Sequence, residues 1–93
     1  MPYIKQEKRD VLDPAIDELL NALRELESDD PNNNMEGNLN YAITRLLKRC
    51  YKGAGYRGIN DAMGMMFSCA LEFYRKDAGP YEDTKEEANG KVE

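Results

Sequence analysis

The sequence predicts an all-α fold, and three observations support this class. Apolar residues recur at helical spacings of three and four positions over most of the 93 residues. No segment shows the strict alternation of a half-buried strand. Proline and glycine stand at the edges of the periodic segments, where helices begin and end. We expect a compact bundle of three main helices, at about residues 14–27, 37–51 and 56–78.

The first main helix is predicted to begin at Asp13-Pro14. Aspartate is a favourable N-cap, and proline fits the first helical position because its missing N–H has no partner there. The apolar side chains that follow fall on one arc: Ala15, Ile16, Leu19, Leu23 and Leu26. Residues 3–12 are expected to form a short N-terminal lead-in of one or two turns, and the polar segment 28–34 is expected to be a loop.

The second helix is expected to start between Met35 and Leu39 and to end near Tyr51, before Gly53 and Gly55. Its predicted buried stripe consists of Leu39, Ile43, Leu46, Leu47 and Cys50. The basic side chains of this helix and Tyr41 point away from that stripe.

The third helix has the broadest apolar face in the chain, an arc of roughly 160° at 100° per residue. A helix with one buried face needs an apolar arc of only about 100°. The helix is therefore predicted to lie between two others or to be shared with a second subunit. Gly64 and Ser68 on its far flank offer a second surface for close helix contact. The face consists of Ile59, Ala62, Met63, Met66, Phe67, Cys69, Ala70, Phe73 and Tyr74.

The C-terminal segment is predicted to form a short helix after Pro80. Gly79-Pro80 is expected to interrupt the third helix, and Gly90 is expected to end the short helix. The last few residues are expected to be disordered. The length fits one helical domain, residues 1–93, because half of this chain would bury too little surface to fold.

Charge and composition exclude several classes of function. The net charge is −5, with an electropositive middle, residues 32–76, between acidic ends. There is no histidine, so the usual general base and histidine metal sites are absent. The two cysteines lie in helical patterns and are expected to be reduced core residues. No signal peptide or membrane span is visible, so a cytoplasmic location is expected. We predict no cofactor, metal site or catalytic residue.

Amide side chains gather at the start of the second helix. Asn38, Asn40 and Tyr41 are placed in its first turn, where free N–H groups and the helix dipole favour an anion. Arg45 follows one turn later and adds positive charge. This pattern predicts a possible small-anion or nucleotide site. The alternative, which we favour, is structural: Asn38 caps the helix and Asn40 bonds to a neighbouring helix.

Two other functional readings are weaker. Glu72 with Glu82, Asp83 and Glu86 superficially resembles the Mg²⁺ carboxylates of all-α nucleotide pyrophosphohydrolases, but the spacing is poor, and a solvated acidic tail explains these residues better. The basic face of the second helix offers a weak nucleic-acid contact, with little interleaved aromatic character. We favour a solvated face that pairs with acidic segments, so nucleic acid is not expected as a partner. That face consists of Arg45, Lys48, Arg49 and Lys52.

Several blocks resemble a family of small uncharacterised proteins from phages and prokaryotes, over nearly the whole chain. They are Leu12-Asp13-Pro14, Gly37-Asn38-Leu39-Asn40-Tyr41, Ile43-Thr44-Arg45-Leu46, Leu71-Glu72-Phe73-Tyr74-Arg75 and Pro80-Tyr81-Glu82-Asp83, with Lys85. Near the end this chain has Asn89-Gly90-Lys91-Val92, where the family has Asn-Gly-Asp-Val, which puts any role for an acid there in doubt. The resemblance implies a compact domain of unknown function and adds no catalytic residue.

The matching blocks predict one polar cluster at an end of the bundle. In an antiparallel bundle the end of the third helix lies near the start of the second. Glu72 and Arg75 would then meet Asn38, Asn40 and Tyr41, with Arg45 nearby and with Tyr81 and Glu82 packed over them.

The function is not specified by the sequence. Our leading expectation is a non-enzymatic helical protein that acts through self-association or protein–protein interaction. We expect a homodimer formed through the third helix, by its broad apolar face or by the Gly64/Ser68 flank. The first alternative is a protein that binds nucleotide or phosphate, or hydrolyses nucleotides with Mg²⁺, at the polar cluster. The second is a weak nucleic-acid binder.

Overall fold

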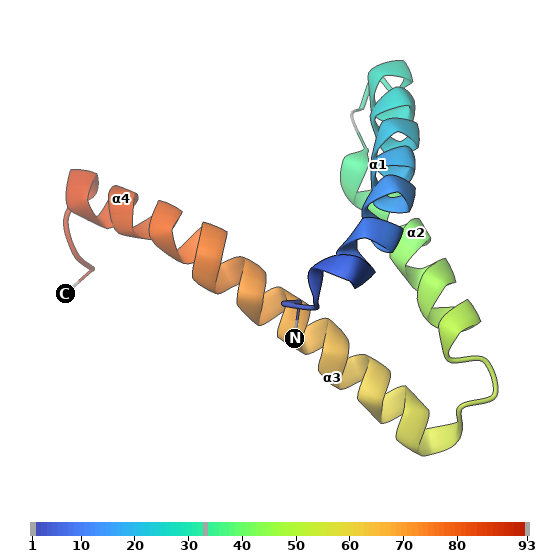
Figure 1. Ribbon diagram of the computed structural model, residues 1–93. Coiled ribbons are helices and arrows are strands. Elements are labelled where there is room, and N and C mark those ends of the chain that lie inside the picture. Colours follow the sequence, from blue (N-terminus) through green and yellow to red (C-terminus); the bar gives the residue numbers. More distant parts are fainter. Residues whose placement is uncertain (1, 33, 93) are drawn as a thin grey trace. The chain divides into compact units, whose positions relative to one another are not determined.

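The computed structural model describes residues 2–32 and 34–92, and it confirms the all-α class. The described residues contain no strand. The chain divides into two units, an N-terminal hairpin of Tyr3–Ala54 and a C-terminal unit from Gly55 onward. The helices in chain order are α1 (Gln6–Asp29), α2 (Met35–Cys50), α3 (Gly55–Phe73), the π-helix η1 (Tyr74–Ala78) and α4 (Gly79–Asn89). Figure 1 labels the four α-helices.

The predicted start of the first helix at Pro14 is wrong. Helix α1 begins at Gln6, and Pro14 lies inside it. The segment expected to be a separate lead-in is therefore, from Gln6 onward, part of α1. Side chains support these turns: Gln6 Nε2 donates to Asp10 Oδ1 over 2.8 Å, and Arg9 Nε donates to the Ile4 carbonyl over 2.8 Å. Asp13-Pro14 has the residue types of a helix start, but it does not begin this helix, because the residues from Gln6 onward are already helical.

Helix α2 begins at Met35 and is capped by Asn34. The Asn34 Oδ1 atom accepts a hydrogen bond from the Gly37 N–H over 3.1 Å. The Asn38 N–H donates to the Asn34 carbonyl over 3.2 Å. The expectation that Asn38 caps this helix is therefore wrong: the cap lies four residues earlier. The preceding loop was predicted at 28–34; α1 extends to Asp29, and Asn33 lies outside the described residues.

The cap couples Asn34 to Gly37 sterically. A Cβ atom added at Gly37 would lie 2.7 Å from both Nδ2 and Oδ1 of Asn34. Alanine at position 37 has a better helix propensity by about 0.5–1 kcal/mol, but it displaces the capping side chain. The glycine therefore preserves the cap at the expense of propensity.

We expect Asn34→Ala to lower the free energy of unfolding by about 1 kcal/mol, since it removes the cap. Gly37→Ala should stabilise the protein by about 0.5–1 kcal/mol in the Asn34→Ala background, and should give a smaller gain or a loss in the wild type. Urea denaturation of the four proteins measures this coupling. Strict additivity of the two changes would contradict the steric account.

The two helices of the N-terminal hairpin contact each other, and Leu23 is the one buried side chain among the described residues, with 6% exposure. The predicted stripe of α2 is confirmed at two of its five positions: Ile43 and Leu47 are half-buried, whereas Leu39 and Leu46 are exposed. Cys50 is exposed as well, as is Cys69 on α3, and both thiols are free. The expectation that the cysteines are core residues is wrong.

The C-terminal unit is a run of helices joined end to end (Figure 1). The predicted interruption at Gly79-Pro80 is instead a change of helix type, since η1 ends at Ala78 and α4 begins at Gly79. The Gly79 N–H donates to the carbonyl of Tyr74, five residues earlier. A Cβ at Gly79 would lie 3.1 Å from that oxygen, so glycine permits the wide turn. The wide turn precedes Pro80, which lacks the N–H that a regular α-turn needs.

Gly90 ends α4, as predicted. Its N–H donates to the Glu86 carbonyl over 2.7 Å, and its φ of 91° lies in the region that favours glycine. Lys91 and Val92 belong to no helix. The prediction that the last few residues are disordered also covers Glu93, which lies outside the described residues.

Candidate functional site

A groove of about 500 Å³ lies between the two helices of the N-terminal hairpin. Helix α1 contributes four apolar side chains to its wall: Leu19, Ala22, Leu23 and Leu26. Helix α2 contributes a mixed set: Asn38, Tyr41, Ala42, Arg45, Leu46 and Arg49. The groove therefore combines an apolar floor with two guanidinium groups and no carboxylate among its lining residues.

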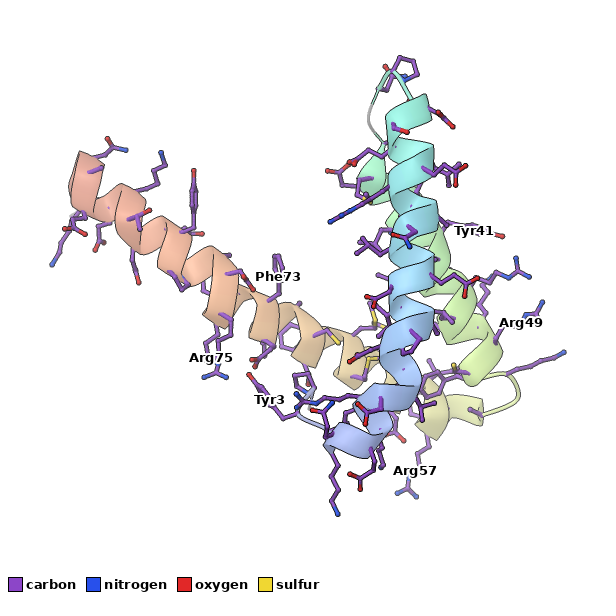
Figure 2. All side chains as sticks on the ribbon, turned by 45° about the horizontal axis from the view of Figure 1, so that its top comes forward. Tyr3, Tyr41, Arg49, Arg57, Phe73 and Arg75 are labelled. Carbon is purple, nitrogen blue, oxygen red and sulfur yellow. The ribbon has the colours of Figure 1, made fainter. Side chains whose placement is uncertain are left out.

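Three of the predicted site residues, Asn38, Tyr41 and Arg45, come together in this groove. Arg45 Nη1 donates to the Tyr41 hydroxyl oxygen over 3.3 Å, which links the two side chains one helical turn apart. Figure 2 shows Tyr41 and Arg49 extending from the same side of α2. Asn38 is half-buried, whereas Tyr41 is 64% exposed. These three residues thus lie together on the side of α2, and their role in binding a ligand stays a prediction.

Asn40 does not line the groove. Its Oδ1 accepts a hydrogen bond from the Thr44 hydroxyl over 3.3 Å on the exposed side of α2. The amide end of α2 also differs from the prediction, because the first turn is Met35–Asn38 and not the segment from Asn38 to Tyr41. The Gly37 N–H is used by the Asn34 cap and the Asn38 N–H by the Asn34 carbonyl. An anion held by the main-chain N–H groups of residues 38, 40 and 41 is therefore incompatible with this helix start.

The other predicted site residues belong to the C-terminal unit, and they form local pairs there. Arg75 Nη2 makes an ion pair with Glu72 Oε2 at 3.2 Å, with the Glu72 side chain 24% exposed. On α4, the Lys85 ammonium lies 5.6 Å from the centre of the Tyr81 ring, and Glu82 is exposed. The first contact joins residues three apart across the junction of α3 and η1, and the second joins residues four apart on α4. A single cluster that also includes residues of α2 stays a prediction, and so do the nucleotide and nucleic-acid alternatives.

The described residues contain neither a candidate metal site nor a membrane-spanning helix. Within residues 2–32 and 34–92, no three or more acidic, cysteine or histidine side chains gather into a group suited to a metal ion. In the same part of the chain, no helix combines the length and the apolar content needed to cross a bilayer.

The sequence reading missed the groove itself. The signal was present as spacing: Leu19, Leu23 and Leu26 repeat at four and three on α1. Asn38, Ala42, Arg45 and Arg49 repeat at four, three and four on α2. These positions share one side of each helix. The sequence pattern does not single out the second set, because two of its four members are charged and charged positions indicate a solvated face.

Comparison with known proteins identifies a family but no activity. The family model described as "Domain of unknown function (DUF6899)" matches residues 1–92, almost the whole chain. Neither the search of curated proteins nor the search of solved structures gave a match. The family carries no assigned function, so the geometry of the chain itself is the basis for any functional inference.

Proposed function

We propose that this chain, which belongs to the DUF6899 family, acts by self-association, with two copies paired through the apolar face of α3. That face is the predicted one, centred on Ile59, Met63, Met66, Phe67 and Ala70. The proposal rests on the exposure of this face to solvent. Ile59 is 56% exposed, Met63 68% and Phe67 66%.

The C-terminal unit supplies no cover for this face from within itself. Helices α3, η1 and α4 follow one another along the chain, and no described element of this unit packs beside α3. A contiguous apolar face of this kind marks an interaction surface. Helix α3 has 19 residues and is therefore about 28 Å long, enough for several turns of contact.

The charge pattern favours a second copy as the occupant. At 100° per residue, Asp61, Glu72 and Arg75 fall on the side of the helix opposite to the apolar face. In a two-fold contact the same face is used by both copies, so an uncharged face avoids like charges opposite each other. The Gly64/Ser68 flank is a weaker candidate, because the Ser68 hydroxyl already donates to the Gly64 carbonyl over 3.0 Å.

Sedimentation equilibrium at micromolar concentration tests the proposal. The wild type is expected to sediment as a dimer of the 10.6 kDa chain. Phe67→Glu should raise the dissociation constant at least about a hundredfold, because one apolar side chain per copy is worth about 1.5–3 kcal/mol on burial. The matched control is Leu71→Glu on the same helix, outside the face, which should leave the dimer intact.

Two outcomes would overturn this assignment. A wild-type protein that stays monomeric throughout the micromolar range would exclude self-association. Dissociation by Leu71→Glu but not by Phe67→Glu moves the contact to the Gly64/Ser68 flank. Circular dichroism of both variants verifies that their helix content is unchanged.

We also propose a cytoplasmic protein of phage or prokaryotic origin. The support is the sequence resemblance given above and the two free cysteines, which suit a reducing compartment. Fractionation of cells that express the native gene tests the compartment.

A further inference from the structure

We infer that the groove between α1 and α2 binds a small amphipathic anion, with a carboxylate or sulfonate head and an apolar tail. This inference concerns the N-terminal hairpin and is independent of the dimer proposed for α3. It replaces the anion site expected at the amide end of α2 with a site formed by side chains one to three turns further along.

The two arginines of the groove favour an anionic head group. Arg45 and Arg49 both line the groove, and they stand one helical turn apart, about 6 Å along the axis. Among the residues that the structure describes, neither guanidinium forms an ion pair, and the groove wall contains no acid. Guanidinium groups bind carboxylates and related oxyanions with paired N–H donors. Two such groups at one site favour an anionic occupant.

Tyr41 helps to position the first of these groups. Its hydroxyl oxygen accepts from Arg45 Nη1 over 3.3 Å. A guanidinium has five N–H donors, so this bond leaves donors available for a ligand. The phenol thereby restricts the Arg45 side chain while leaving its charge unneutralised. Less side-chain freedom then has to be lost when an anion binds.

The apolar floor of the groove favours a ligand with an apolar tail. Leu19, Leu23, Leu26 and Leu46 contribute apolar surface to the same space as the two guanidinium groups. Leu26 is 53% exposed and Leu46 55%, so apolar surface is available for contact. A free phosphate gains nothing from this surface, whereas a hydrocarbon tail gains about 0.8 kcal/mol for each methylene buried. The groove volume of about 500 Å³ lies within the usual range for small-ligand sites.

Titration of the ¹⁵N-labelled full chain with dodecanoate, kept below its micelle concentration, tests the inference. Amide shifts confined to residues 38–49 and 19–26 should saturate at one ligand per chain. Arg45→Gln and Arg49→Gln should each weaken binding about tenfold or more, since each loses a charge-assisted hydrogen bond. Lys48→Gln is the matched control: it removes one charge from the same helix outside the groove and should leave affinity unchanged within about twofold.

Two further ligands distinguish the contribution of the head group to the affinity from that of the tail. Dodecanol has the same tail without charge, and acetate has the head without the tail; both should bind at least about tenfold more weakly than dodecanoate. The inference is overturned if dodecanol binds as tightly, if Lys48→Gln weakens binding as much as Arg45→Gln, or if no saturable shift appears in the groove. Dispersion of the amide spectrum verifies that each variant is folded.

Discussion

Replacing Leu23 with alanine is expected to lower the free energy of unfolding by about 2–3 kcal/mol and the melting temperature by about 10 °C or more. Leu23 is the only described side chain that is buried, with 6% exposure, and it lies where α1 meets α2. Removal of its branched end takes apolar surface from the hairpin and leaves a cavity that the two helices fill only in part. Thermal unfolding followed by circular dichroism measures the shift.

The matched control for this change is Leu20→Ala. Leu20 is the same residue type on the same helix, but it is 37% exposed and does not line the groove. Leu20→Ala should lower the free energy of unfolding clearly less than Leu23→Ala does. Equal losses at the two positions would show that the hairpin contact is not centred on Leu23. If Leu23→Ala unfolds the chain, Leu23→Ile and Leu23→Met, which nearly conserve volume, give the graded comparison.

Replacing Pro14 with alanine is expected to stabilise the protein, by as much as about 3 kcal/mol for the N-terminal turns of α1. Pro14 lies inside α1, where it has no N–H to donate to the Asp10 carbonyl and its ring crowds that oxygen. Alanine restores the donor and removes the crowding. Hydrogen exchange of the amides from Arg9 to Ile16 measures the effect locally, and urea denaturation measures it globally.

Pro80→Ala is the control for this prediction. The wide turn of η1 directly precedes Pro80, so the backbone there already departs from the geometry in which proline clashes. The gain at position 80 should therefore be smaller than the gain at position 14. A loss of protection in residues 6–13 on Pro14→Ala would indicate that these turns depend on the proline, contrary to the expectation.

The helices that the sequence predicts best are those with unambiguous ends. Helix α2 was expected at 37–51 and runs from Met35 to Cys50, and the third was expected at 56–78 and spans α3 with η1. In both cases the boundaries carry glycine or asparagine next to a clear apolar period. Helix α1 was predicted eight residues too short at its start because Asp13-Pro14 has a strong N1 signature. Its true start at Gln6 follows Lys5, which makes no side-chain cap.

Local spacing in the sequence accounts for part of the groove. Asn38, Tyr41 and Arg45 line it together because they lie close in sequence and one helix fixes their spacing. The share of α1 in the groove could not be derived, since it depends on which sides of two helices meet. In α2 the apolar stripe and the groove side differ by roughly 100°, and the periodicity of one helix does not choose between them.

The π-helix also limits how far the apolar face of α3 extends. On a continuous α-helix, Tyr81 would stand fourteen residues after Phe67 and within about 40° of it. A turn closed by an i to i+5 bond takes in about one residue more, which shifts the azimuth of everything beyond it by about 100°. Tyr81 then lies about 140° from Phe67, at the edge of the face, whereas Glu82 and Glu86 lie within about 40° of Phe67, so that carboxylates continue the line of the face on α4. The wide turn therefore ends the apolar surface at η1, and a partner that follows the face along α3 loses contact there.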